Sequence, residues 1–200
     1  MSDAYVIYGC GGHARSVAEV ILYNQPDAKL TFVDDAARPD EKIFGFDVVA
    51  DSPASGGVGF VALGDNLKRQ SICESLGDNL TQVIAKDAHI GRDTELGAGC
   101  FVGHEAYTGP LVSVGEASII NTRAIVEHEV KIGRASQICP GVIIGGRTTI
   151  GDNVFVGLGA TIIDGITICS DVIIGAGAVV VNNIDQPGTY VGVPARRIDG

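Results

Sequence analysis

The segment IGRASQICPGVIIGGRTTIGDNVFVG, residues 132–157, contains the pattern that indicates the fold. An aliphatic side chain recurs there at every sixth position, at Ile132, Ile138, Ile144, Ile150 and Val156. Glycine follows four of these five residues. A helix repeats every 3.6 residues and a strand every two, so neither by itself generates a strict period of six. The period indicates a repeat architecture in which each hexad is one structural unit.

The same phase extends over most of the second half of the chain. From Ile90 to Val180 it has sixteen positions, of which fifteen are Ile, Leu or Val and one is Thr108. Glycine comes next at ten of them, which explains much of the total of 28 glycines in 200 residues. The aliphatic residue fills an interior position, and we expect the glycine beside it to occupy a sharp bend with positive φ. The pattern predicts a parallel β-helix.

The unbroken Ile/Val-Gly-x-x-x-x pattern resembles the left-handed hexapeptide β-helix of acyltransferases, in which three hexads form one triangular coil. Sixteen hexads would give a little over five coils. Equivalent positions of successive coils would then stack on one another, which predicts three interior ladders: Val126–Ile144–Ile162–Val180, Val114–Ile132–Ile150–Ile168 and Ile120–Ile138–Val156–Ile174.

Residues 1–85 have a different organisation, in which apolar strand segments alternate with amphipathic helical ones. Expected strands cover residues 5–8, 30–33 and 59–63, and expected helices cover 14–23 and 68–76. This alternation predicts a small parallel sheet with its ligand at the carboxyl ends of the strands. The expected fold class is therefore α/β plus all-β, with a small Rossmann-like parallel α/β domain followed by a left-handed parallel β-helix.

The first expected strand ends in a glycine turn, GCGGHA at residues 9–14, which formally matches G-x-G-x-x-A. A dinucleotide-binding oxidoreductase is the obvious rival interpretation. However, the segment 1–85 is long enough for one mononucleotide-binding half of such a fold and not for both. A single nucleotide, with its phosphates at the turn amides and the helix N-terminus, fits this segment better.

Charge, hydropathy and cysteine content argue against several kinds of partner and environment. The net charge of −10 and the absence of a Lys/Arg run disfavour nucleic acid and anionic membranes. The N-terminus lacks the pattern of a signal peptide, and no apolar stretch approaches a membrane span, so a cytoplasmic protein is expected. Five scattered cysteines without a C-x-x-C pair predict neither disulfides nor a zinc site, and no metal is expected.

The glycine turn, the hexads and the terminal segment VGVPAR at residues 191–196 together resemble the nucleotide-sugar acetyltransferases of the sialic acid O-acetyltransferase family. That family includes enzymes that N-acetylate UDP-linked 4-amino sugars in bacillosamine synthesis. The most specific segment is INTRAIVEHE at residues 120–129. The resemblance implies that residues 1–85 form a Rossmann-like sugar-nucleotide-binding domain. It also implies that residues 86–200 form a left-handed β-helix acetyltransferase domain with a C-terminal cap.

The resemblance further implies an acetyl-CoA-dependent N-acetyltransferase that acts on a nucleotide-linked amino(-dideoxy) sugar by direct transfer in a ternary complex. O-acetylation of sialic acid or a related sugar is the alternative. A non-catalytic sugar-nucleotide-binding or scaffold protein is the rival from another class.

The resemblance makes His128 the general base and Glu129 the carboxylate that raises its basicity. A histidine suits this chemistry because its proton affinity is matched to neutral pH. Adjacent strand residues point to opposite faces, however, so Glu127 remains a competing partner for His128. The hexad register adds Gly146, which lies one coil after His128 and would leave a groove over it for the thioester arm.

Further residues follow from the same resemblance. Those implied for the nucleotide sugar are Gly11, Gly12, His13, Asp34, Asp35 and Gly64. Those implied for acetyl-CoA, besides Gly146, are Gln137, Leu158 and Ala176. The resemblance also implies a homotrimer with active sites between subunits. The sequence does not distinguish UDP, GDP and dTDP.

Overall fold

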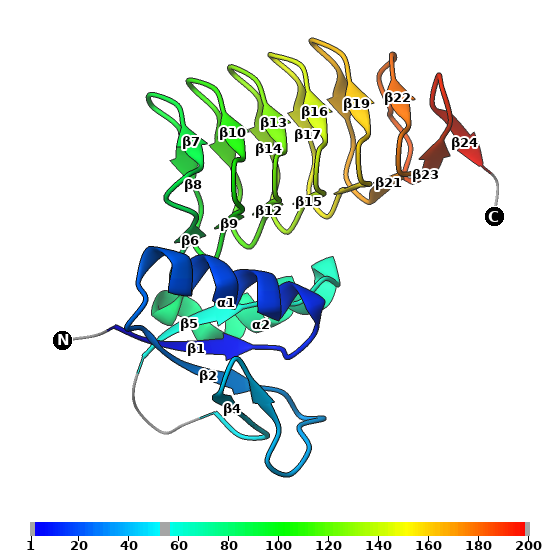
Figure 1. The fold of residues 1–200 in the computed structure, drawn as a ribbon. Coiled ribbons are helices and arrows are strands. Elements are labelled where there is room, and N and C mark those ends of the chain that lie inside the picture. The colour runs from blue at the N-terminus through cyan, green and yellow to red at the C-terminus, as the bar shows by residue number, and fades with distance from the viewer. Residues whose placement is uncertain (1–2, 53–56, 199–200) are drawn as a thin grey trace.

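A computed structural model describes residues 3–52 and 57–198. It consists of an amino-terminal α/β unit that packs against a solenoid of short strands (Figure 1). The sheet of the α/β unit has the order β3-β4-β2-β1-β5. Its strands are β1 (Ala4–Tyr8), β2 (Lys29–Val33), β3 (Lys42–Ile43), β4 (Phe46–Val49) and β5 (Val58–Val61). Its helices are α1 (Gly12–Asn24), α2 (Asn66–Leu76) and the short 3-10 helix η1 (Gly77–Asn79).

Helices α1 and α2 cover opposite faces of this sheet. Ile7 and Phe60 pack in the cluster that contains α1, while Val61 packs with Cys73 of α2. This arrangement follows from strand alternation, which sends neighbouring side chains to opposite faces. The expected strands and helices are all present, and their ends differ from the expected ones by no more than two positions.

The prediction of a parallel sheet is wrong at one edge. Strand β4 pairs in parallel with β2, but β3 pairs antiparallel with β4 in a hairpin that no sequence pattern indicated. Its two-residue turn consists of Phe44 and Gly45, with φ values of 52° and 85°. Both turn residues adopt positive φ, as a tight hairpin of right-twisted strands requires.

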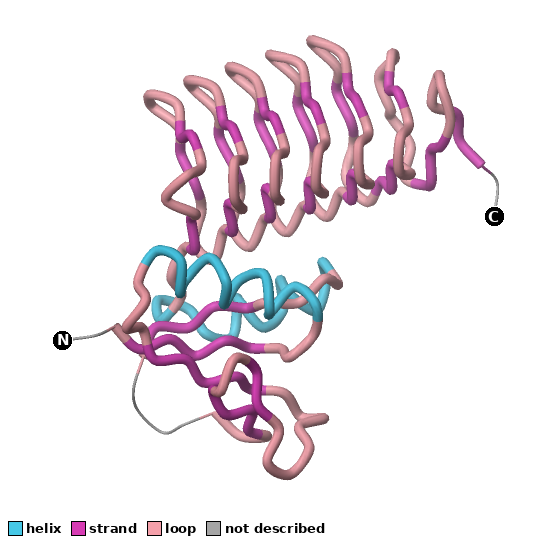
Figure 2. The backbone as a smooth tube through the Cα atoms, viewed as in Figure 1, coloured by secondary structure: helices cyan, strands magenta, loops and turns pink. Residues whose placement is uncertain are grey.

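Three sheets form the faces of the solenoid. We name them by what lies on their outer sides: the docked sheet carries the α/β unit, the apolar sheet mostly apolar side chains and the polar sheet polar side chains. The docked sheet consists of β6 (Val83–Ile84), β9 (Phe101–Val102), β12 (Ile119–Ile120), β15 (Gln137–Ile138), β18 (Phe155–Val156), β21 (Val172–Ile174), β23 (Gly188–Val191) and β24 (Arg196–Ile198). The apolar sheet consists of β7 (His89–Ile90), β10 (Tyr107–Thr108), β13 (Ile125–Val126), β16 (Ile143–Ile144), β19 (Thr161–Ile162) and β22 (Val179–Val180). The polar sheet consists of β8 (Glu95–Leu96), β11 (Ser113–Val114), β14 (Lys131–Ile132), β17 (Thr149–Ile150) and β20 (Thr167–Ile168). Figure 2 shows these short strands alternating with turns around each coil.

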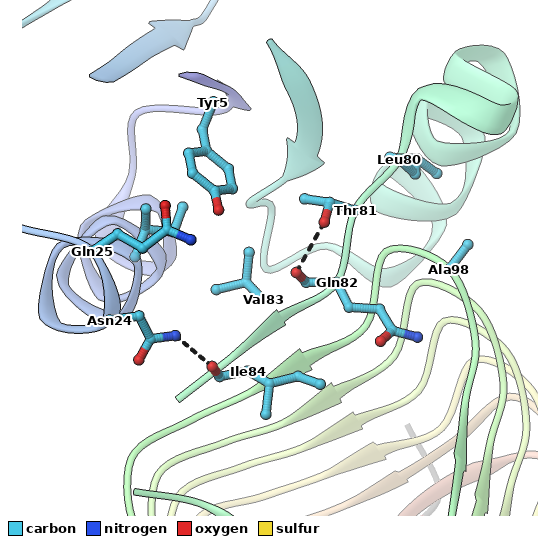
Figure 3. A pocket seen from close by; sticks show the side chains of 10 residues that line it. Tyr5, Asn24, Gln25, Leu80, Thr81, Gln82, Val83, Ile84 and Ala98 are labelled. Atoms are coloured by element: carbon cyan, nitrogen blue, oxygen red, sulfur yellow. Dashed lines mark hydrogen bonds between the residues drawn. The ribbon is translucent and has the colours of Figure 1, made fainter. Parts of the chain in front are cut away.

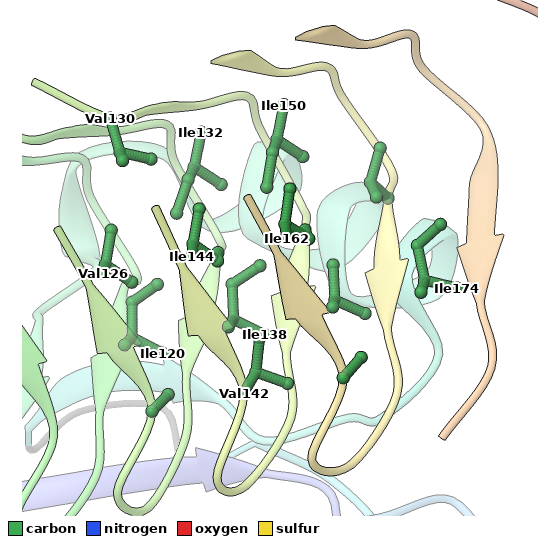
Figure 4. Packing of buried hydrophobic residues seen from close by; sticks show 14 of the residues in the cluster. Ile120, Val126, Val130, Ile132, Ile138, Val142, Ile144, Ile150, Ile162 and Ile174 are labelled. Atoms are coloured by element: carbon green, nitrogen blue, oxygen red, sulfur yellow. The ribbon is translucent and has the colours of Figure 1, made fainter. Parts of the chain in front are cut away.

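The stacking register is confirmed. Val126 pairs with Ile144 and Ile144 with Ile162, each pair one coil apart, and the other two predicted ladders pair in the same way. Their side chains fill the interior of the solenoid (Figure 4). The solenoid is parallel throughout these coils, and the hexad repeat fits the left-handed β-helix. Strand β24 closes the carboxyl end as an antiparallel partner of β23.

The expected reason for the hexad glycines is wrong. The residue directly after the interior aliphatic does not have positive φ. Positive φ occurs at the third residue after the aliphatic, for example at Glu129 (60°), Arg147 (57°) and Asn153 (55°). The glycines themselves are required by close stacking. A Cβ on Gly145 would lie 2.5 Å from the backbone nitrogen of Asp164 in the next coil, and one on Gly133 would meet the backbone of Gly151 at 2.5 Å.

The α/β unit lies on the docked sheet. Phe101 and Ile119, which point outward from β9 and β12, are fully buried in the cluster that contains α1. The ring of His13 packs edge-on against Phe101, with 5.1 Å between centroids. Farther along the same row of the sheet, Ile173 is 47% exposed, so the α/β unit covers the first coils and leaves the later ones open.

Candidate active site

His128 lies in the turn between β13 and β14, at the corner where the apolar sheet meets the polar sheet. Its Nδ1 is 3.0 Å from Oε2 of Glu129. An ionised carboxylate can only accept a hydrogen bond, so this contact assigns the proton to Nδ1 and leaves the lone pair on Nε2. The side chains of His128 and Glu129 are 40% and 50% exposed, so the pair is open to a ligand.

Of the two candidate partners of His128, Glu129 and not Glu127 forms the hydrogen bond with its ring. Glu129 has a φ of 60°, a left-handed turn conformation in which the strand alternation of side chains no longer holds. This turn brings its carboxylate to the ring of His128. Among the described residues, His128 has no hydrogen bond with Glu127.

Gly146 lies directly over the ring of His128. A Cβ built on Gly146 would be 2.6 Å from both Nε2 and Cε1 of His128 and 3.1 Å from its Cδ2. Because Gly146 has no side chain, the space beside Nε2 of His128, the nitrogen that carries the lone pair, is left open. The register argument from the sequence, which stacked Gly146 on His128, agrees with this geometry.

The segments implied for the nucleotide sugar converge at one edge of the α/β sheet. Strand β1 lies between β2 and β5, so the glycine turn after β1 lies between Asp34-Asp35 and Gly64. A Cβ on Gly11, Gly12 or Gly64 would meet nothing within 4 Å, so the backbone at all three is open to a ligand. A cavity of about 560 Å³ opens at the same edge. Its polar lining comes from Tyr8, Asp34, Asp35, Lys68 and Ser71.

Asp34 and Asp35 differ in their partners. Both oxygens of Asp34 accept backbone hydrogen bonds, from Cys10 at 3.0 Å and from Ala36 at 3.0 Å. Hydrogen bonding by Cys10 is the main reason why the pKa of Asp34 is lowered, and the N–H of Ala36 adds to it. Burial, together with Asp34, raises the pKa of the Cys10 thiol to about 11, so this thiol is protonated at neutral pH. Asp34 thus holds the glycine turn in place.

His13 is neutral at physiological pH. Burial is the main reason why its pKa is lowered to about 4, and the charge of Arg69 contributes. Its Nε2 is buried and has no hydrogen-bond partner among the described residues. Gln137 lies on the docked sheet, two coils beyond Phe101. Its Oε1 is also buried and has no hydrogen-bond partner among the described residues.

The four residues implied for acetyl-CoA do not meet in one chain. Leu158 and Ala176 lie one coil apart at the corner between the docked and apolar sheets, and Gly146 lies at the other edge of the apolar sheet. Gln137 lies on the docked sheet, where its Nε2 contacts Sγ of Cys139 at 3.6 Å. Leu158 is 57% exposed.

Arg69 is a candidate that no sequence pattern indicated, although it is the one charged residue among the fully buried side chains of the described chain. Nothing in the pattern of α2 marks it, because its partners are backbone carbonyls from distant segments.

The cavity of about 580 Å³ in Figure 3 lies at the opposite end of the α/β sheet and contains none of the predicted site residues. Within the described ranges, no group of three or more His, Cys, Asp and Glu side chains could bind a metal. None of the described helices has the length and apolarity needed to cross a membrane.

Comparisons with known proteins agree with this geometry. Residues 5–76 match the model of the PglD N-terminal domain, and residues 147–181 match the hexapeptide repeat of succinyl-transferase. Among curated proteins, no sequence match is found.

Two solved structures are similar over almost the whole chain. PerB from Caulobacter crescentus, in complex with CoA and GDP-perosamine, is 32% identical with a TM-score of 0.88, and the match covers 98% of this chain and 97% of that one. The acetyltransferase domain of PglB from Neisseria gonorrhoeae is 29% identical with a TM-score of 0.91, covering 98% and 100%. The resemblance stated from the sequence is therefore confirmed, and the chain belongs to the family of hexapeptide-repeat nucleotide-amino-sugar acetyltransferases.

Proposed function

We propose that this protein transfers an acetyl group from acetyl-CoA to the amino group of a nucleotide-linked amino sugar, with His128 as the general base. The proposal rests on the arrangement around Nε2 of His128. Glu129 holds the proton on Nδ1 of His128, and Gly146 leaves Nε2 uncovered. The similar PerB structure, which contains CoA and GDP-perosamine, supports the two substrate classes.

The reaction needs one base and no covalent acyl-enzyme. The sugar amine attacks the thioester carbonyl, forming the C–N bond, and Nε2 of His128 accepts the proton that the nitrogen loses. The C–S bond then breaks, and the imidazolium of His128 returns that proton to the sulfur of CoA. Glu129 stabilises the imidazolium, and a base placed in this way contributes about 10²–10⁴-fold to the rate. The products are the N-acetyl sugar nucleotide and CoA.

The α/β unit would bind the nucleotide. Gly11, Gly12 and the N-terminus of α1 present open backbone to the phosphates, as helix N-termini commonly do. Asp35 borders the cavity and, unlike Asp34, accepts no backbone hydrogen bond from the described residues, so it is the carboxylate available to a ribose or base. His13 and Gly64 would approach the same ligand.

The two halves of this site belong to different subunits in our proposal. The α/β unit covers the docked sheet, whereas His128 lies at the corner opposite that sheet, so one chain holds its nucleotide away from its own base. The apolar sheet, beside His128, exposes Ile143 (43%) and carries Ile125 and Val179 on its outer face. A homotrimer joined through this sheet would place His128 near the neighbour's nucleotide and near Gln137, Leu158 and Ala176. The cytoplasmic location expected from the sequence remains a prediction.

The test combines a panel of nucleotide-linked amino sugars with acetyl-CoA, followed by mass spectrometry before and after mild alkali. We expect a mass gain of one acetyl group that resists alkali, because an amide persists where an ester is cleaved. Loss of the label in alkali would assign O-acetylation instead. His128→Ala should lose most of the transfer while still binding CoA, and wild-type rates in this variant would refute the role of His128.

A further inference from the structure

Arg69 connects the α/β unit to the solenoid. Its side chain projects from α2 and is fully buried. Its Nε donates to the carbonyl of Ala117 at 2.7 Å, and its Nη2 donates to the carbonyl of Ala135 at 3.0 Å. These two alanines occupy successive coils at the corner between the polar and docked sheets.

The same guanidinium also fixes the loop that follows β5. Nη1 donates to the carbonyl of Leu63 at 2.8 Å, and Nη2 donates to Oδ1 of Asn66 at 2.8 Å. Leu63 and Asn66 flank Gly64, which belongs to the open edge of the sheet described above. Four of the five N–H groups of a guanidinium are therefore used, two on each side of the boundary between the α/β unit and the solenoid.

Among the described residues, no carboxylate forms an ion pair with this guanidinium, although the charge of Asp65 acts on it. Burial is the main reason why the pKa of Arg69 is lowered, to about 10, so the guanidinium remains charged at neutral pH. A buried charge is costly unless it is fully hydrogen-bonded. An aliphatic side chain would fill this place at lower cost, but it would not bind two carbonyls of the solenoid and one carbonyl of the loop at fixed angles. The rigid fork of arginine provides that directional link.

We propose that Arg69 is a positioning residue, which fixes the nucleotide-binding loop at Gly64 relative to the solenoid and so sets where the sugar amine meets the acetyl donor. This inference rests on the proposed function. In the proposed trimer the α/β unit holds the nucleotide, and the solenoid of the neighbouring subunit holds the base. The placement of the α/β unit on its own solenoid sets its placement relative to that neighbour, so an error there becomes an error in the distance between reacting atoms. A misplacement of about 1 Å can cost about 100-fold in rate.

The experiment compares Arg69→Lys and Arg69→Met with wild type, at a temperature well below each melting transition. Lysine keeps the charge but places its donors on one atom, so it cannot reach both sides of the boundary. We expect kcat at saturating substrates to fall roughly 10- to 100-fold in both variants. The Kd for CoA, which the solenoid would determine, should stay at the wild-type value. A residue that served only stability would lower the melting temperature and leave kcat unchanged.

Two further variants make the test decisive. Arg134→Met removes an exposed arginine that is paired with Asp152 in the same corner turn, and kcat should not change. Asn66→Ala removes one acceptor of the guanidinium while Arg69 stays in place, so it tests the link even if the Arg69 variants fail to fold, and kcat should fall several-fold. Wild-type kcat in Asn66→Ala and in every folded Arg69 variant would overturn the positioning role. A wild-type enzyme inactive on all nucleotide-linked amino sugars would instead overturn the proposed function.

Discussion

Replacing Gly146 by alanine tests the arrangement around His128 most directly. The added methyl carbon would lie 2.6 Å from Nε2 and Cε1 of His128, whereas an ordinary contact is 3.4–4 Å. The imidazole would have to move by about 1 Å to relieve this overlap, and a displacement of that size at a catalytic group can cost about 100-fold in rate. We therefore expect kcat for acetyl transfer to fall roughly 10- to 100-fold.

The same substitution should leave stability almost unchanged. Gly146 does not have positive φ, and the atoms that a Cβ would meet belong to a partly exposed side chain that can rotate away. Gly145→Ala is the opposite case, because its Cβ would lie 2.5 Å from the backbone nitrogen of Asp164. Overpacking against backbone costs about 1–3 kcal/mol. In a chain of this length, each kcal/mol lowers Tm by about 2–4 °C.

The assay is steady-state kinetics at saturating substrates together with a thermal melt of each variant. Gly141→Asn is a suitable control, because a Cβ there meets nothing within 4 Å and Asn153 already holds the same positive-φ place in another hexad. This control should keep wild-type kcat. The reasoning is refuted if Gly146→Ala keeps wild-type kcat, or if it loses activity only together with its fold.

Three further outcomes are expected. Glu129→Gln should lower kcat roughly fivefold to tenfold, because a hydrogen bond to a charged group is worth about 1 kcal/mol more than a neutral one, while Glu127→Gln should match wild type; equal rates in both would remove Glu129 from the mechanism. Asp34→Asn should melt below wild type at pH 7, and the difference should shrink as the pH falls below about 4, because the folded-state pKa of Asp34 is lowered and its stabilisation is lost as the carboxylate becomes protonated; an undiminished difference in stronger acid would contradict this. Ile143→Glu should reduce the mass measured by light scattering to that of a monomer and abolish transfer with an unchanged far-UV spectrum, and an unchanged mass would argue against assembly through the apolar sheet.

The solenoid was predictable because one physical constraint repeats sixteen times. Fifteen of the sixteen positions in this phase, such as Ile144, are aliphatic, so the phase is visible in a single sequence. The hairpin of β3 and β4 occurs once, and its Phe44-Gly45 turn lacks the Asn-Gly or Asp-Gly signal that usually marks such turns. The α/β unit was therefore predictable in its central strands and not at its edge.

The candidate site was predictable where it depends on the register and unpredictable where it depends on tertiary contacts. The stacking of successive coils places Gly146 on His128 from the sequence period alone, and the geometry agrees. Only the family resemblance favoured Glu129 over Glu127. The residue pattern alone could not make this choice, because it depends on the left-handed backbone at Glu129. Arg69 left no sequence signal, because the carbonyls that it binds belong to residues 48 and 66 positions away.

The two turn positions of the hexad explain how a structural repeat can carry a catalytic group. The residue after each interior aliphatic must usually be small, because the next coil approaches within contact distance of its Cα. The next position points outward at a corner and tolerates any side chain, as Pro110, His128, Gly146 and Asp164 show on successive coils. A functional residue can therefore be placed there without disturbing the stack. Access to it then depends on the side chain one coil later, so a single glycine at that position is enough to uncover His128.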